Sequence, residues 1–256
     1  KDGLEGVRRE EERVVRAREI VGDEVELAVD GWLSLDVEYA VRVAEMLKKD
    51  GTLYTANYRA AKSIMHYTPA KTGTIAWQPV FTFFGYRYVE LTGLPEGVKP
   101  APDWVTGAVL HSAFERIGTF TSSHAKLNRL QKNITWGQRG NYLDIPTDCP
   151  QRNERLGWTG DAQVFCATSL FNFDTLSFWM SWLQSVREEQ KKDGAICHVV
   201  PETGCGAGSP GWGDVAVTSP WNVYVRTGHR RVLAEHYDMM RKWTAKYERE
   251  AKGYIV

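Results

Sequence analysis

Hydrophobic and polar positions follow two different periods along the chain, and the change falls near residue 120. Apolar and polar residues alternate over 25–29 and 33–37, which is the period of a half-buried strand. Three further segments are short and rich in aromatic and β-branched residues, as strands commonly are: 80–84, 86–91 and 105–110. Short strands separated by turn residues predict a β-sandwich domain over residues 1–120.

After residue 120, apolar residues recur every three or four positions, which is the period of an amphipathic helix. Three stretches carry this pattern: Leu127, Leu130 and Ile134; then Phe173, Leu176, Met180, Leu183 and Val186; then Val232, Leu233, His236, Tyr237, Met240, Trp243 and Tyr247. Ser122 and Ser123 are suited to cap the first helix. Long loops at 140–160 and 193–213 separate the stretches, and such loops are uncommon unless they are functional. The pattern therefore predicts antiparallel helices with functional loops at one end.

The composition narrows the possible partners. The chain has 256 residues, enough for one large domain or two smaller ones. Hydrophobic residues make up 43% and charged residues 25%, which excludes a wholly disordered chain. Lys and Arg total 32, as do Asp and Glu, so the basic excess typical of nucleic-acid binding is absent. We therefore do not expect nucleic acid as a partner. No run of about 18 apolar residues occurs, so we do not expect a membrane as a partner either.

Cysteine and tryptophan contents bear on the chemistry. The four cysteines (Cys149, Cys166, Cys197 and Cys205) form no Cys-x-x-Cys pair and are too sparse for a disulfide scaffold. We therefore expect no metal site and no cofactor. The ten tryptophans are several times the usual share. Tryptophan fills cores, but it also packs on the C–H faces of sugars, so the excess is a weak indication of carbohydrate binding.

The densest polar chemistry lies in the loop 146–161. It holds three carboxylates, two arginines and one tryptophan between prolines and glycines. If the end of this loop were helical, Glu154, Trp158 and Asp161 would share one face. A solvated loop with surface salt bridges, each worth little, is the alternative interpretation.

The run DCPQRNERLGWTGD over residues 148–161 resembles the signature of the bacterial α-L-rhamnosidases of glycoside hydrolase family 78. Similar stretches flank it at 53–55, 83–90, 133–141 and 211–214, and the resemblance covers about residues 40–250. It implies a β-sandwich, here truncated at its start, followed by the first half of an (α/α)6 barrel. We therefore expect a β-sandwich domain over 1–120 and the N-terminal part of the barrel over 121–256.

The same resemblance implies hydrolysis of a terminal α-L-rhamnosyl residue with inversion at the anomeric carbon. Inversion needs one protonated carboxyl that supplies a proton to the leaving oxygen and one carboxylate that activates water. Glu154 matches the general acid of the family. Like-charge repulsion from Asp148 and Asp161 would favour its protonated form.

Other positions of the motif match family residues that hold the substrate. Asp148, Arg152 and Asp161 match positions that bind sugar hydroxyls, and Trp158 and Trp212 match aromatic residues that line the pocket. Apolar ring faces suit a 6-deoxy sugar, because its methyl group and ring C–H bonds are themselves apolar. The expected partner is accordingly a rhamnosylated carbohydrate or glycoside.

Alternatives remain for each of these residues. Trp158 alone could belong to a core, and Asp214, next to Trp212 and Gly213, could cap a helix. Asn153 stands where many relatives carry Asp, which leaves room for a degenerate or non-catalytic carbohydrate-binding relative. An inverting (α/α)6 glycosidase that acts on another sugar is a further possibility.

Length is the largest departure from the family. A complete six-hairpin barrel needs about 12 helices of about 11–12 residues, more than 121–256 can supply. The general base of the family is a glutamate that we expect beyond Val256. The chain is therefore expected to be a piece cut at both ends, with the acid present and the base missing, and inactive by itself. Aglycone, linkage, oligomeric state and compartment (cytoplasmic or secreted) stay open.

Overall fold

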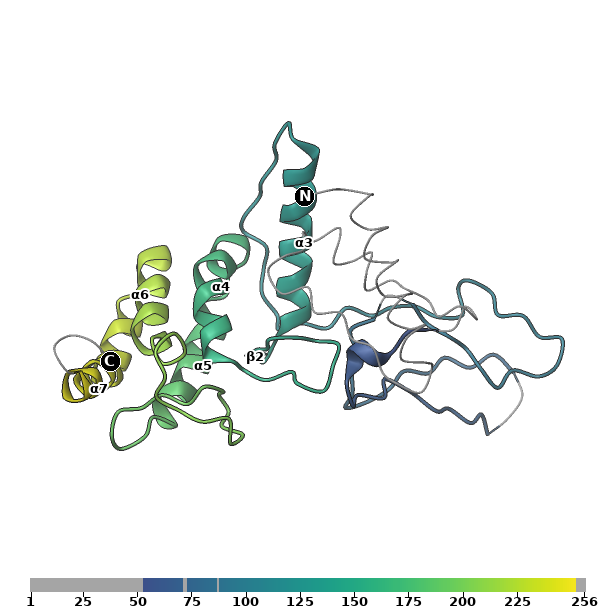
Figure 1. The fold of residues 1–256 in the computed structure, drawn as a ribbon. Coiled ribbons are helices and arrows are strands. Elements are labelled where there is room, and N and C mark those ends of the chain that lie inside the picture. The colour runs from purple at the N-terminus through teal and green to yellow at the C-terminus, as the bar shows by residue number, and fades with distance from the viewer. Residues whose placement is uncertain (1–52, 71–72, 87, 252–256) are drawn as a thin grey trace, which may run out of the picture. The chain divides into compact units, whose positions relative to one another are not determined.

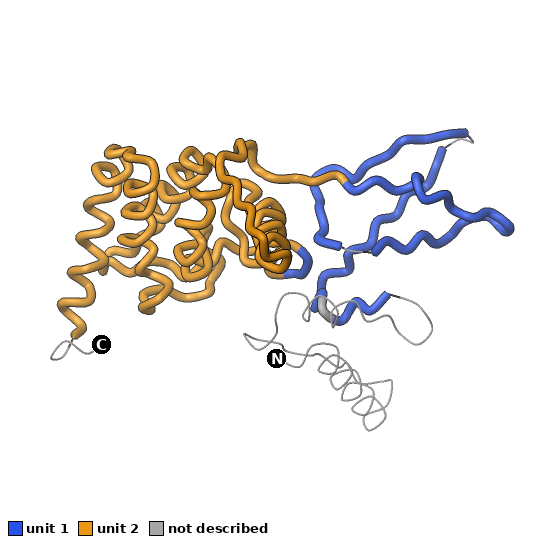
Figure 2. Tube along the Cα trace, turned by 90° about the horizontal axis from the view of Figure 1, so that it is seen from above, with its two compact units in different colours: residues 1–107, 151–153 blue, residues 108–150, 154–256 orange. Residues whose placement is uncertain are grey.

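The chain divides into two compact units. The computed structural model describes residues 53–70, 73–86 and 88–251 (Figure 1). The two units are coloured differently in Figure 2: unit 1 comprises 1–107 and 151–153, and unit 2 comprises 108–150 and 154–256.

Unit 1 contains little regular structure in its described part. A short 3-10 helix, η1, spans Ala56–Tyr58, and the remaining described residues of the unit form neither helix nor strand. An extended segment becomes a strand only when a neighbouring segment pairs with its backbone groups. Because no such ladder links the described parts of 80–84, 86–91 and 105–110, the predicted β-sandwich is not confirmed here. The predicted strands at 25–29 and 33–37 lie outside the described residues.

Unit 2 is helical, as the sequence period after residue 120 predicts. Its described helices are, in chain order, α3 (Ala125–Asn141), α4 (Thr159–Asn172), α5 (Leu176–Glu188), α6 (Val215–Thr227) and α7 (Arg231–Glu250). A two-residue strand β1 (Tyr142–Leu143) pairs antiparallel with β2 (Ile145–Pro146) directly after α3. None of the described helices combines the length and the apolar character needed to cross a bilayer.

The ends of the predicted helices differ in detail from the observed ones. Helix α3 begins one residue after His124, and Ser122 does not cap it; the Ser122 backbone instead exchanges two hydrogen bonds with the Asn128 side chain. Phe173, expected inside a helix, is the extended residue that follows α4. It is nevertheless fully buried, so its apolar character reflects the core rather than a helix face.

Paired helices enclose a core rich in tryptophan. Helix α4 packs against α6, α6 packs against α7, and α5 contacts both α6 and α7. Trp179, Trp182 and Trp243 are each at most 2% exposed. The buried indole N–H groups are satisfied, since Trp179 donates to Ser169 Oγ at 2.8 Å and Trp182 donates to the Val200 carbonyl at 3.0 Å.

The two long loops of unit 2 are joined to each other at one end of the helices. The backbone N–H of Val200 donates to the Gly157 carbonyl, and the N–H of Thr159 donates to the His198 carbonyl, both at 2.9 Å. Gly157 is required at this junction, because a Cβ atom there would lie 2.1 Å from the Val200 carbonyl oxygen. The loops that precede α4 and α6 are thus fixed side by side.

Candidate active site

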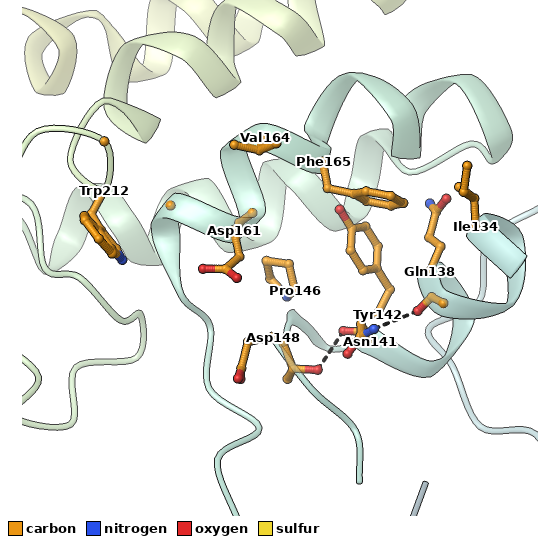
Figure 3. A pocket seen from close by; sticks show the side chains of 15 residues that line it. Ile134, Gln138, Asn141, Tyr142, Pro146, Asp148, Asp161, Val164, Phe165 and Trp212 are labelled. Atoms are coloured by element: carbon orange, nitrogen blue, oxygen red, sulfur yellow. Dashed lines mark hydrogen bonds between the residues drawn. The ribbon is translucent and has the colours of Figure 1, made fainter. Parts of the chain in front are cut away.

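A pocket of about 610 Å³ lies in unit 2 where α3 ends and α4 begins. Asp148, Asp161 and Trp212 occupy one end of it, and Phe165, Gln138 and Ile134 occupy the other (Figure 3). The complete lining is Ile134, Gly137, Gln138, Asn141, Tyr142, Pro146, Thr147, Asp148, Gly160, Asp161, Ala162, Val164, Phe165, Gly211 and Trp212. The pocket therefore joins a charged end to an uncharged end with two apolar side chains, Phe165 and Ile134.

Asp148 is held by Leu156 on the opposite side of its loop. The Leu156 N–H donates to Asp148 Oδ1 at 2.9 Å, and the Asp148 N–H donates to the Leu156 carbonyl at 3.0 Å. This pair of hydrogen bonds closes a ring of the chain and fixes the direction of the carboxylate. Asp148 lines the pocket as a consequence of this clamp.

Glu154 lies beside Asp148 and is oriented by Trp158. The indole N–H of Trp158 donates to Glu154 Oε1 at 3.2 Å, and both side chains are partly buried. One carboxylate oxygen each from Asp148 and Glu154 and the Sγ atom of Cys149 lie within 4.8 Å of one another. The two carboxyl groups are consequently close enough to repel each other strongly when both are ionised.

The expected helical face is only partly right. Helix α4 begins at Thr159, and Trp158 is the extended residue before it, so Glu154 and Trp158 do not meet across a helix turn. They meet because the chain turns sharply at Arg155, which has a φ of 50° in the left-handed region. Only Asp161 lies in the helix, in its first turn, where the helix dipole favours negative charge.

Asp161 is the carboxyl whose protonation is most affected by this arrangement. Desolvation raises the pKa of Asp161, and the neighbouring Asp148 and Glu154 charges raise it further, against a backbone hydrogen bond that lowers it. The protonated form of Asp161 is therefore favoured by its burial and by the two other carboxyl groups of the motif.

Trp212 forms the wall of the pocket beyond Asp161. It is 40% exposed, and its indole lies so close to Gly160 that an added Cβ would be 3.2 Å from both Cδ1 and Nε1. Asp214 occupies the residue before α6, but its side chain makes no capping bond. Its carboxylate accepts hydrogen bonds from the Gly211 N–H at 3.0 Å and the Trp243 indole N–H at 3.2 Å. Asp214 thus braces the turn that carries Trp212.

The described residues include one set of donor atoms close enough to share an ion, namely those of Asp148, Cys149 and Glu154. Calcium and magnesium prefer shells made of oxygen, whereas a buried thiol is a soft ligand. The mixture suits neither a hard cation nor a four-ligand zinc site. We assign no metal to it.

Sequence reasoning located the charged end of this pocket and missed the apolar end. Asp148, Asp161 and Trp212 line the same cavity, and Glu154 and Trp158 adjoin it through Asp148 without lining it. Arg152 belongs to the segment 151–153 that clusters with unit 1. Tyr142 and Phe165 were not anticipated; the spacing of four residues from Asp161 to Phe165 on one helix is the signal that could have found the second of these.

Two family descriptions match the chain. Residues 115–255 match the bacterial α-L-rhamnosidase six-hairpin glycosidase domain, and residues 28–111 match the bacterial α-L-rhamnosidase concanavalin-like domain. The first defines the class, a six-hairpin glycosidase domain, which agrees with the paired helices of unit 2 and supports part of an (α/α)6 barrel. The chain belongs to the bacterial α-L-rhamnosidase family.

Individual relatives agree with this assignment. An α-L-rhamnosidase of Formosa agariphila is 56% identical over 216 residues, covering 84% of this chain and 23% of the relative. One of Streptomyces avermitilis is 44% identical over 216 residues, covering 84% of this chain and 21% of the relative. The chain thus spans less than a quarter of the length of either curated relative.

Solved structures give the same result. The crystal structure of the Streptomyces avermitilis α-L-rhamnosidase complexed with L-rhamnose aligns with a TM-score of 0.78 at 44% identity, over 82% of this chain and 20% of that one. The native enzyme from Aspergillus terreus aligns with a TM-score of 0.72 at 39% identity, over 77% of this chain and 23% of that one.

Proposed function

We propose that the protein to which this chain belongs is an inverting glycoside hydrolase that releases terminal α-L-rhamnose from glycosides or polysaccharides. The observation that carries the proposal is the convergence of Asp148, Glu154 and Asp161 beside a pocket walled by Trp212. Similarity to α-L-rhamnosidases, one of them solved with L-rhamnose, supports the choice of sugar.

Glu154 is the proposed general acid. Cleavage of a glycosidic bond requires a proton on the leaving oxygen, which a suitably placed carboxyl group can supply. The Glu154 carboxyl lies beside Asp148, which lines the pocket. The hydrogen bond from Trp158 to Oε1 fixes the plane of the carboxyl and so the direction in which its proton is presented.

The remaining residues of the proposed site bind the sugar. Asp148 and Asp161 accept hydrogen bonds from hydroxyl groups of rhamnose, and charge-assisted bonds of this kind are stronger than neutral ones. Trp212 offers an apolar face to the ring C–H bonds and the C6 methyl group. Trp158, which adjoins the pocket through Glu154, and Arg152 are proposed as further sugar contacts on the similarity of the motif alone.

The reaction also needs a carboxylate that activates water on the other face of the sugar. The motif at 148–161 contains the proposed acid, and our proposal assigns the base to a glutamate outside that motif. The match of residues 28–111 to the concanavalin-like domain supports a β-sandwich over 1–120, with the barrel beginning at 121.

The test uses the complete enzyme with a chromogenic aryl α-L-rhamnoside and a natural rhamnoside whose leaving group is poor. Glu154→Gln is expected to abolish turnover of the natural substrate while retaining binding of L-rhamnose. Glu188→Gln, on the exposed face of α5 where its partner is Gln184, is the matched control and should keep full activity. NMR observation of the first-formed anomer reports inversion.

Three outcomes would overturn parts of the proposal. Unchanged hydrolysis by Glu154→Gln would remove the general acid. A panel of aryl glycosides in which another sugar is cleaved and the rhamnoside is not would leave the reaction type but replace the substrate. Binding of L-rhamnose without any turnover by the wild-type enzyme would favour the non-catalytic alternative.

A further inference from the structure

We propose that His198 is a positioning residue for Trp212: as a neutral imidazole it holds the turn that presents the indole to the pocket. The inference rests on the proposed function insofar as it concerns sugar binding. It concerns a residue that the motif does not contain and that does not line the pocket.

Both ring nitrogens of His198 bind backbone groups of the loop that leads to Trp212. The Ser209 N–H donates to Nε2 at 3.2 Å, and Nδ1 lies 3.1 Å from the Cys205 carbonyl oxygen. A backbone N–H can only donate, so Nε2 must be the acceptor and Nδ1 must carry the proton that it donates to Cys205. The two contacts are therefore compatible with one neutral tautomer and not with the imidazolium.

The backbone of His198 is anchored to the charged end of the pocket. Its carbonyl accepts hydrogen bonds from the Thr159 N–H at 2.9 Å and the Thr159 hydroxyl at 3.0 Å. Thr159 is the first residue of α4 and stands two residues before Asp161. His198 thus connects the helix that carries a pocket carboxylate to the turn that carries the pocket tryptophan.

The imidazole also approaches the indole directly. The two ring centroids are 5.7 Å apart with a tilt of 46°. Trp212 also packs against Gly160, and the Gly211 backbone is braced by the Gln163 side chain from α4 and by Asp214. These contacts fix the C-terminal side of the turn. The bond from Ser209 to His198 fixes its N-terminal side.

A rigid indole is worth more to binding than a mobile one. Trp212 is 40% exposed, so packing alone does not immobilise it. A wall residue that is already in place saves the ordering cost that a flexible one incurs when the sugar binds. Loss of the His198 acceptor is therefore expected to weaken binding without altering proton transfer at Glu154.

The first experiment follows Trp212 itself and needs no substrate. The complete protein is labelled with 5-fluorotryptophan, and the ¹⁹F resonance of Trp212 is assigned by its absence from Trp212→Phe. His198→Asn keeps a hydrogen-bond donor near the position of Nδ1 but has no acceptor that reaches the Ser209 N–H. The longer side chain introduced by His198→Gln brings a carbonyl oxygen that can accept the Ser209 hydrogen bond in place of Nε2. We expect a broadened or shifted Trp212 signal in His198→Asn and a signal near that of the wild type in His198→Gln. An unchanged signal in His198→Asn overturns the positioning role, whatever sugar the enzyme cleaves.

The second experiment is a double-mutant cycle with an aryl α-L-rhamnoside. His198→Asn is expected to raise KM about three- to tenfold, the loss of one hydrogen bond, with kcat within about twofold. In a Trp212→Ala background the same substitution should change KM by less than about twofold, because its effect passes through the indole. His198→Gln should recover most of the loss. Equal effects in both backgrounds, or no recovery in the His198→Gln variant, would overturn the inference.

The two experiments separate two kinds of failure. If wild-type enzyme cleaves no rhamnoside, the proposed function fails while the ¹⁹F spectra still decide the role of His198. If rhamnoside is cleaved and His198→Asn leaves KM and the Trp212 signal unchanged, the positioning role fails alone. Thermal unfolding of each variant shows that the comparison is made between folded proteins.

Discussion

The indole N–H of Trp158 donates a hydrogen bond to Oε1 of Glu154 at 3.2 Å. This contact gives Trp158 a role beyond that of an apolar surface for sugar, because it fixes the carboxyl that we propose as the general acid. Trp158 is itself fixed, since its backbone bridges to Val199 in the neighbouring loop. The orientation of the acid is thus determined by the junction between two loops.

Trp158→Phe is predicted to lower kcat/KM for a rhamnoside about tenfold. The change removes the indole N–H but keeps an aromatic ring, so the carboxyl of Glu154 loses its orienting bond, and a hydrogen bond to a neutral group contributes about 0.5–1.5 kcal/mol. Steady-state kinetics on the complete enzyme measure the effect. The loss should be larger for substrates with poor leaving groups, because these depend most on the acid.

A matched control removes an indole N–H elsewhere. Trp179 donates to Ser169 Oγ inside the core and makes no hydrogen bond to Glu154 through its indole N–H. Trp179→Phe should lower the melting temperature and leave the kinetic constants of the folded enzyme nearly unchanged. Equal kinetic losses in the two variants would show that the Trp158 bond has no special connection with the acid.

Asp161→Asn is predicted to stabilise the protein near neutral pH while it impairs rhamnoside binding. The raised pKa of Asp161 means that the native state holds its proton more tightly than the unfolded state does. Stability from such a group is present below its ordinary pKa and is lost as the pH rises through the folded value. The melting temperature of Asp161→Asn should therefore exceed that of the wild type at pH 7, and the difference should shrink as the pH falls.

Asp238 on α7 provides a control because its pKa is shifted in the opposite direction from that of Asp161. Hydrogen bonds from Lys242 and Arg241 lower the pKa of Asp238, so its contribution to stability is present at neutral pH and lost in acid. Asp238→Asn should be slightly less stable than the wild type at pH 7, with no difference in strong acid. Parallel melting curves for the two variants across this range would contradict the assignment of the Asp161 shift.

The sequence pattern predicts a helix of this protein when that helix has one apolar face and one polar face. Helices α3, α5 and α7 show the expected period and were anticipated. Helix α6 was not, because buried positions such as Val215, Ala216 and Val223 lie around an interior proline, Pro220. A helix that is apolar on several sides has no amphipathic period, and its proline is usually taken as a helix end.

Part of the candidate site follows from residues that are close in the sequence, and part depends on contacts that the spacing of residues does not reveal. The motif places Asp148, Glu154 and Asp161 in one short segment, so their proximity follows from the sequence. The bond from Trp158 to Glu154 depends on the turn at Arg155, and the position of Trp212 depends on how the loop before α6 packs on Gly160. Neither has a signature in the spacing of residues.

Gly157→Ala is predicted to destabilise unit 2 by about 1–3 kcal/mol. A Cβ at this position would lie 2.1 Å from the Val200 carbonyl oxygen, which is backbone and cannot turn aside. The two loops must then separate, and the bond from the Val200 N–H to the Gly157 carbonyl is lost with them. Chemical denaturation measures the change in the free energy of unfolding.

Gly137→Ala is the matched control for the same substitution. Gly137 lies inside α3, and a Cβ there would meet nothing within 4 Å. Alanine in a helix is about 0.5–1 kcal/mol more favourable than glycine, so this variant should gain stability. A loss of stability in Gly137→Ala comparable to that in Gly157→Ala would show that the backbone clash is not the cause.

Gly160→Ala is predicted to weaken rhamnoside binding without weakening the fold. The new Cβ would stand 3.2 Å from Trp212 Cδ1 and Nε1, so the indole must shift by a few tenths of an ångström. Alanine in the first turn of α4 also favours the helix, which separates the effect on the pocket from any effect on stability. We expect KM to rise about threefold with an unchanged or higher melting temperature.

Gly140→Ala, whose nearest contact is the Pro150 side chain at 3.6 Å, should leave KM unaltered. If Gly160→Ala also leaves KM unaltered, the placement of Trp212 against Gly160 has no part in holding the sugar.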